Sequence, residues 1–163
     1  MSKDTGRERV RKSLRSRWNY VKEKPQITLS NIASLDSDKS EVMDLALAYY
    51  RLSEHDNLLR TVSLFSCMTT VVRNLLVRDR ILTPDLKQKI KEILRQTDTK
   101  FSETEFENNW KDFYVDERCY IAHGAGIKLV DVRTYSEYEE IVNKVGYWAR
   151  SVLYYYINEH KKP

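Results

Sequence analysis

The sequence predicts an all-α protein, a compact bundle of four to six helices. The chain of 163 residues has only four glycines and three prolines, with 32% charged and 41% hydrophobic residues. These proportions are typical of a compact helical protein. Apolar residues recur at spacings of three and four, and no alternating strand pattern is longer than about four residues. The length suits one hydrophobic core.

The chain divides into a basic amphipathic arm (1–24), a connector (25–39) and a helical domain (40–163). The arm carries nine Lys or Arg against three Asp or Glu, a net charge of +6, whereas residues 25–163 carry −2. Such an arm can bind a polyanion or simply keep a tail solvated. Its apolar stripe comprises Val10, Leu14, Trp18 and Val21. The candidate RNA-binding residues are Arg7, Arg11 and Arg15.

Two helices are expected in the first part of the domain. The connector has no sustained helical stripe after Pro25 and is expected to hold no more than a short turn. Residues 40–55 are apolar on most sides, as in a helix with neighbours around it. Asp56 is a candidate cap for the next helix, which runs to about Leu82 and is predicted to be central.

A shorter surface helix follows. Thr83 is a candidate cap, and Pro84 fits the first turn, where its missing amide hydrogen is not needed. The helix has a single apolar stripe. That stripe comprises Leu86, Ile90, Ile93 and Leu94.

Two capping-box patterns predict the last two helices. Ser102 with Glu105 begins a helix of about 20 residues, and Ser136 with Glu139 begins the final helix. The first has its apolar face at Phe106, Trp110, Phe113 and Ile121. The final helix has Tyr138, Ile141, Val145, Trp148, Val152 and Tyr155 at helical spacing. The run Tyr154 to Tyr156 is expected to contact a second copy of the chain, because aromatic residues are enriched at interfaces.

The two cysteines and the lack of long apolar segments indicate in which compartment the protein works. Cys67 and Cys119 show neither a paired framework nor zinc-ligand spacing, so we expect no disulfide, metal or cofactor, and a reducing compartment. The amino terminus lacks the apolar core of a signal peptide, and no segment has the 18 to 20 apolar residues of a spanning helix. We therefore expect a cytoplasmic protein that does not enter the membrane.

Catalytic chemistry is suggested where the helix that begins at Ser102 is expected to end, in Arg118-Cys119-Tyr120-Ile121-Ala122-His123-Gly124. An imidazole transfers protons near neutral pH, and a guanidinium grips a phosphate through two parallel hydrogen bonds. Arg118 and His123 therefore suit metal-independent cleavage of a phosphodiester. A capping histidine beside a surface arginine is the structural alternative. His55 and His160 have no such arginine and are assigned no role.

Helix geometry limits how Arg118 and His123 could act on the same phosphate. On an ideal helix, positions 118 and 123 diverge by about 140°. They converge only if the helix ends at His123, or if two copies pack so that their helix ends flank one groove. The helix dipole favours a protonated His123. Groups that could orient the pair are Asp116, Glu117 and Tyr120.

These residues resemble the signature of the HEPN superfamily, an arginine and a histidine four to six residues apart, late in a helical chain. The resemblance covers roughly residues 40–160. It implies a metal-independent endoribonuclease that acts as a toxin or in antiviral defence. Members of the superfamily commonly form dimers, so the resemblance also implies a homodimer. It further implies attack of a ribose 2′-hydroxyl on its own phosphate, with His123 in proton transfer and Arg118 on the phosphate. Single-stranded RNA is then the substrate, and an antitoxin or other regulatory protein is a possible partner.

Two other hypotheses stay open. One is a noncatalytic HEPN module that binds a nucleotide or a protein beside a partner enzyme. Cys119 favours it, since the residue after the family's arginine is usually polar, often Asn or Asp. The other is a nucleic-acid adaptor that works through the basic arm alone.

Overall fold

The computed structural model describes residues 27–55, 60–76, 82–114 and 135–163. Within these ranges the chain forms six helices and no strand, which confirms the all-α prediction. The helices are α2 (Leu29–Ala33), α3 (Ser37–His55), α4 (Arg60–Leu76), α5 (Thr83–Thr97), α6 (Glu103–Lys111) and α9 (Tyr135–His160). None of them is long and apolar enough to span a bilayer.

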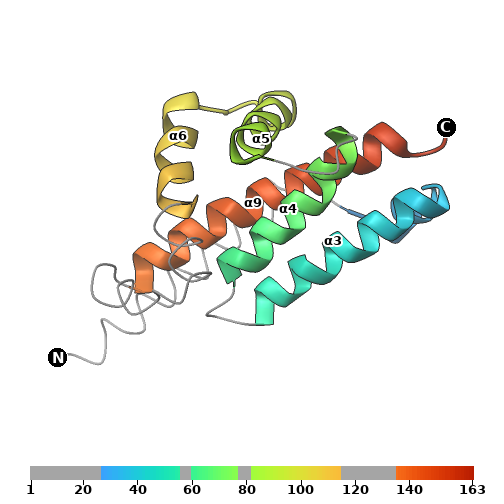
Figure 1. The fold of residues 1–163 in the computed structure, drawn as a ribbon, viewed down its shortest axis with the longest axis horizontal. Helices are drawn as coiled ribbons and strands as arrows, with labels where there is room; N and C mark the ends of the chain where they lie inside the picture. The colour runs from blue at the N-terminus through green and yellow to red at the C-terminus, as the bar shows by residue number, and fades with distance from the viewer. Residues whose placement is uncertain (1–26, 56–59, 77–81, 115–134) are drawn as a thin grey trace.

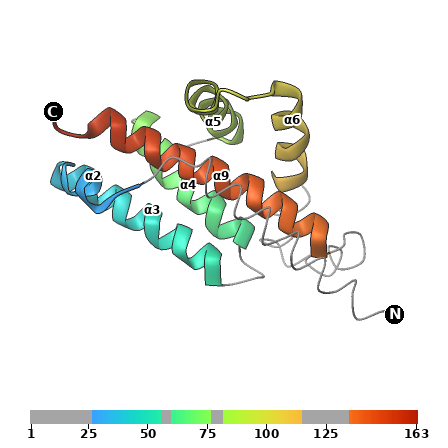
Figure 2. The same ribbon diagram turned by 180° about the vertical axis from the view of Figure 1, so that it is seen from behind.

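Three long helices, α3, α4 and α9, lie side by side along the length of the bundle (Figure 1). α4 runs antiparallel to α3 and parallel to α9, and it packs against both, so it is central as predicted (Figures 1 and 2). α5 packs across α4 and α9 on one side of the layer, and α6 stands beside the first half of α9. The described part of α9 is also buried along most of its length, with only Glu140 and Glu159 exposed.

The apolar stripes form the core. Leu86, Ile90, Ile93 and Leu94 are all buried, so the stripe predicted for α5 is confirmed. The core also contains Met43, Met68, Val72, Trp148 and Leu153. Burial of this apolar surface is the main favourable contribution to folding.

Two of the predicted caps are wrong. α5 begins at Thr83 itself, with Leu82 as its N-cap, although Pro84 does lie in the first turn. α9 begins at Tyr135, so Ser136 lies inside the helix and cannot be its N-cap. Helix boundaries depend on tertiary contacts as well as on local pattern, which explains shifts of one or two residues.

The cap of α6 is confirmed at Ser102, whose hydroxyl accepts a hydrogen bond from the Glu105 amide at 3.3 Å. α6 ends at Lys111 and passes into a wider π-type turn at residues 112–114. The rest of the helix predicted from Ser102 lies outside the described residues. α2 confirms a short turn in the connector, and α3 starts at Ser37, three residues before the expected boundary.

Candidate functional site

The predicted catalytic residues, Arg118 and His123, lie outside the residues that the structure describes. The same is true of Asp116, Glu117 and Tyr120, and of Arg7, Arg11 and Arg15 in the arm. The structure does describe the residues on either side of the segment that contains the motif. They are Tyr114, beyond the end of α6, and Tyr135, the first residue of α9.

A buried ion pair holds the beginning of α9. The Arg60 guanidinium donates to the Glu139 carboxylate through Nη1, and its Nε donates to the Ser53 carbonyl oxygen at 3.1 Å. The two charged side chains are only 8% and 6% exposed. The pair therefore fixes the last turn of α3, the start of α4 and the first turns of α9 at one end of the bundle. The sequence predicts Glu139 as part of a capping box with Ser136. In the structure Glu139 pairs with Arg60 instead.

An aromatic cluster holds Tyr114, on the other side of the segment. Tyr114 stacks on Trp110 with ring centroids 5.9 Å apart and contacts Phe65 of α4 at 5.9 Å. Phe106 contacts Trp148 of α9 at 4.8 Å. Large aromatic side chains thus bridge α6 to α4 and α9, and such pairs add to the energy of burial. Both points that flank residues 115–134 are consequently anchored in the core.

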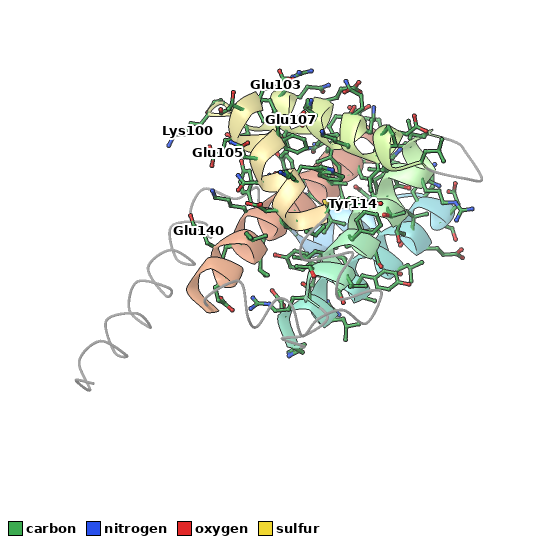
Figure 3. The ribbon with its side chains drawn as sticks, turned by 60° about the vertical axis from the view of Figure 1, so that its left-hand side comes forward. Lys100, Glu103, Glu105, Glu107, Tyr114 and Glu140 are labelled. Carbon is green, nitrogen blue, oxygen red and sulfur yellow. The ribbon has the colours of Figure 1, made fainter. Side chains whose placement is uncertain are left out.

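Charged side chains connect α5 to α6. Lys87, Lys91 and Arg95 repeat every four residues on α5, and Glu103 and Glu107 do the same on α6. Arg95 pairs with Glu103 at 2.8 Å, and Lys91 pairs with Glu103 at 3.2 Å. Glu107 pairs with both Lys87 and Lys91. We call this set the α5–α6 ion-pair ladder; Figure 3 shows its two glutamates on α6.

The ladder shifts the pKa values of Glu103, Glu107 and Lys91. A hydrogen bond from Arg95 lowers the pKa of Glu103, and one from Lys87 lowers the pKa of Glu107. Hydrogen bonding to Glu107 raises the pKa of Lys91. These groups are charged and mutually satisfied near neutral pH, so the ladder is a structural feature and offers no proton-transfer group.

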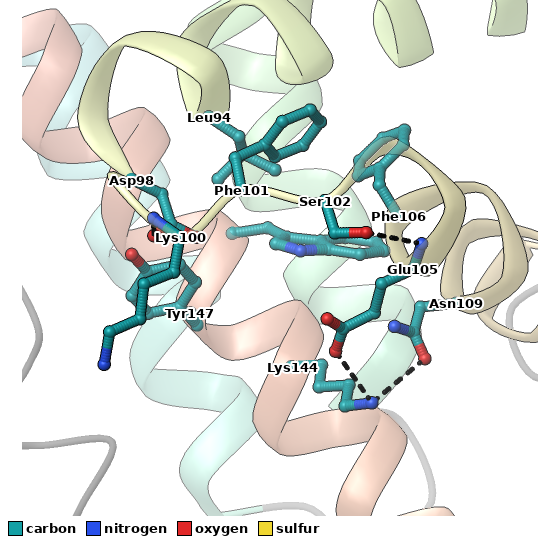
Figure 4. A pocket seen from close by; sticks show the side chains of 11 residues that line it. Leu94, Asp98, Lys100, Phe101, Ser102, Glu105, Phe106, Asn109, Lys144 and Tyr147 are labelled. Carbon is teal, nitrogen blue, oxygen red and sulfur yellow. Dashed lines mark hydrogen bonds and ion pairs between the residues drawn. The ribbon is translucent and has the colours of Figure 1, made fainter.

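A pocket of about 250 Å³ lies between the α5–α6 turn and α9 (Figure 4). Its rim has two acidic and two basic side chains, Asp98, Glu105, Lys100 and Lys144. Lys144 is held by Glu105 at 3.3 Å and by the Asn109 side-chain oxygen at 3.4 Å. Two of the aromatic residues that line it, Phe106 and Trp148, are buried, whereas Phe101 and Tyr147 are partly exposed. Acidic and basic side chains balance on the rim, so the pocket has no excess of positive charge for a phosphate.

The described histidines and cysteine offer no second catalytic group. His55 is exposed at the end of α3, and burial lowers the pKa of His160, whose ring packs on Tyr156. Burial raises the pKa of the Cys67 thiol to about 12, so it is not a reactive nucleophile near neutral pH. Among residues 27–55, 60–76, 82–114 and 135–163, no group of three or more His, Cys, Asp or Glu side chains could hold a metal ion.

One of the three tyrosines of the predicted dimer contact, Tyr156, faces the core of the bundle. Tyr156 is fully buried, and its hydroxyl donates to the Asn74 side-chain oxygen at 2.9 Å. Lys39 of α3 donates to the same oxygen at 2.9 Å. Tyr156 therefore links α9 to α4 inside the bundle. Tyr154 and Tyr155 are partly exposed, so the predicted contact with a second copy stays a prediction for these two residues and excludes Tyr156.

No protein-family model, curated protein or solved structure matches the chain. The function must therefore be argued from the residues and their arrangement.

Proposed function

We propose that the protein is a metal-independent endoribonuclease that cleaves single-stranded RNA. The observation that carries the proposal is Arg118 and His123 with four residues between them, followed by Gly124, late in an all-helical chain. The anchored points on either side support it. The Arg60–Glu139 pair and the aromatic cluster anchor the described residues that precede and follow the segment 115–134, which supports a site built next to packed helices.

The chemistry needs a proton acceptor for the 2′-hydroxyl, a proton donor for the 5′-oxygen and a phosphate-binding group. The ribose 2′-oxygen loses its proton and forms a bond to the adjacent phosphorus, while the bond from phosphorus to the 5′-oxygen breaks and that oxygen gains a proton. The products are a 2′,3′-cyclic phosphate and a free 5′-hydroxyl. His123 transfers the proton, and Arg118 neutralises the charge that grows on the nonbridging oxygens. Asp116, Glu117 and Tyr120 are the candidates to orient them.

A cleavage assay with chelator tests the proposal. Wild-type protein should cut single-stranded RNA in EDTA and leave cyclic phosphate ends, whereas His123→Ala should cut at least about a hundredfold more slowly. Arg118→Ala should lose comparable activity, and Arg118→Lys should not restore it, because lysine lacks the two-pronged donor geometry. His160→Gln is the matched control, since His160 lies at the far end of α9 from this segment. Equal cleavage by wild type and His123→Ala would exclude the catalytic assignment.

Cys119 favours a second function, a noncatalytic module that binds a nucleotide or a protein partner beside an enzyme. In that case wild-type protein would leave RNA intact, and Arg118→Ala would weaken ligand binding instead.

Deleting residues 1–24 measures how far Arg7, Arg11 and Arg15 contribute to RNA affinity and to its salt dependence. An antitoxin or other regulatory partner would be sought by copurification with the intact chain.

A further inference from the structure

The side of α3 that points away from the core carries an ordered set of exposed residues. On an α-helix these positions fall within an arc of about 120°, opposite the buried Met43, Ala46 and Ser53. All seven are exposed. They are Glu41, Asp44, Leu45, Ala48, Arg51, Leu52 and His55.

The apolar part of this face is a seam of two leucines. Leu45 is 51% exposed and Leu52 is 46% exposed, and they are among the most exposed large hydrophobic side chains of the described chain. Seven residues separate them, so they lie almost on one line along the helix with Ala48 between them. This is the spacing at which two helices interlock their side chains. An exposed seam of this kind is typical of a contact with another helix.

The charges on the face are arranged with opposite sign about Ala48. The acidic residues precede it, and the basic residues follow it. Glu41 lies seven residues before Ala48 and His55 seven residues after, while Asp44 and Arg51 lie four before and three after. Among the described residues, no ion pair joins these four side chains to another group.

This order makes the face complementary to itself. A second α3 in the antiparallel direction, centred on Ala48, places Asp44 beside the partner's Arg51 and Glu41 beside the partner's His55. It also brings Leu45 next to the partner's Leu52. A parallel pair would instead oppose Asp44 to the partner's Asp44 and Arg51 to the partner's Arg51, which is unfavourable. Self-complementarity is the condition that a two-fold symmetric interface must satisfy.

We propose that α3 is a homodimer interface, in which two copies of the chain pair antiparallel about a two-fold axis near Ala48. The pairing does not depend on the proposed nuclease activity. α3 ends at the same end of the bundle as α6 and the start of α9 (Figure 1). In the antiparallel pair the two His55 positions lie about 20 Å apart along the helices. Tyr114 and Tyr135, the described residues on either side of 115–134, thus lie toward one end of the proposed dimer in one copy and toward the other end in its partner.

Charge exchange at Asp44 and Arg51 tests the interface and its direction. The full chain and its variants are compared by sedimentation equilibrium over a wide range of protein concentration. Asp44→Arg or Arg51→Asp alone should weaken dimerisation at least about fivefold, because each gives the face two like charges. The double variant Asp44→Arg/Arg51→Asp should regain dimerisation. An equal mixture of the two single variants should form a heterodimer tighter than either homodimer.

Leucine substitution tests the seam. Leu45→Glu should weaken dimerisation at least about tenfold, because the variant must bury a carboxylate where Leu45 would contact the partner's Leu52. Leu82→Glu is the matched control, because Leu82 is 55% exposed but lies outside α3. It should dimerise like the wild type. Circular dichroism checks that all variants keep the helical content of the wild type.

Three results would overturn the proposal. The first is a wild-type chain that stays monomeric over the whole concentration range. The second is dimerisation of Leu45→Glu that equals that of Leu82→Glu. The third is a double charge variant that dimerises no better than the single ones, which would exclude the antiparallel contact. In the first case, deletion of residues 1–24 would show whether the arm covers α3, because a truncated chain that dimerises would assign the arm to that face.

Discussion

Two of the ionic sites that join helices among the described residues differ mainly in burial. The Arg60–Glu139 pair is a single contact with side chains 8% and 6% exposed. The α5–α6 ion-pair ladder has five charged groups; its Lys91 is 11% exposed, but the carboxylates of Glu103 and Glu107 are 56% and 38% exposed, so water reaches these pairs. Exposed pairs gain little because water and salt screen them, whereas a buried charge that loses its partner has no solvent to replace it. Burial, more than the number of pairs, therefore sets how much each site matters.

The largest effect is expected from breaking the buried pair. Glu139→Ala leaves the Arg60 charge buried without its carboxylate, so the free energy of unfolding should fall by about 3–5 kcal/mol. Urea unfolding followed by circular dichroism measures the loss. Arg60→Met combined with Glu139→Leu should recover most of it, since no charge then remains buried. A loss below about 1 kcal/mol in Glu139→Ala would show that the two sites do not differ as their burial suggests.

A smaller effect is expected from the ladder. Glu107→Gln removes the carboxylate shared by Lys87 and Lys91, and unfolding free energy should fall by only about 0.2–1 kcal/mol. The difference from wild type should shrink further in concentrated salt. Glu54→Gln, an exposed residue outside the ladder, serves as the control and should change neither value. A salt-insensitive loss as large as that of Glu139→Ala would contradict the exposed character of the ladder.

The smallest effect is a pH dependence. Because the pKa values of Glu103 and Glu107 are lowered in the folded protein, the stability they contribute is complete above the ordinary carboxyl pKa of 4.5. It is lost as the pH falls through their lower folded-state values. The stability difference between wild type and Glu107→Gln should therefore be constant near neutral pH and narrow below about pH 4.5. A difference that stays unchanged in acid would show that the carboxylate charge is not responsible.

The sequence predicts the helices better than it predicts the ionic sites that join them. The stripe from Leu86 to Leu94 and the cap at Ser102 are local patterns, and local patterns predict helices well. The Arg60–Glu139 pair joins residues 79 positions apart, which periodicity does not reveal. A signal was nevertheless present. Arg60 lies in register with Leu64, Cys67 and Val71, and Glu139 with Val142, Ala149 and Leu153, so both charges fall on buried stripes.

The tyrosine run shows the converse limit. Three consecutive residues on a helix point in different directions, so Tyr156 faces the core while Tyr154 does not. Sequence alone ranked the run as an interface because of its composition. Leu45 and Leu52 show the same limit, because residues 40–55 are predicted to have neighbours on most sides, yet these two leucines of α3 are exposed. The motif at Arg118 and His123 remains a prediction from spacing and resemblance.

The carboxyl terminus of the chain is itself fastened. The Lys162 ammonium pairs with Asp36 at 2.8 Å, and its amide donates to the Ser34 carbonyl at 3.1 Å. α9 has 26 residues, so this anchorage lies about 39 Å from the start of that helix. A fluorophore or affinity tag appended after Pro163 would thus emerge beside α2, far from the end at which residues 115–134 attach. Binding of the proposed RNA substrate could then be tested on the labelled protein without the label obstructing that end.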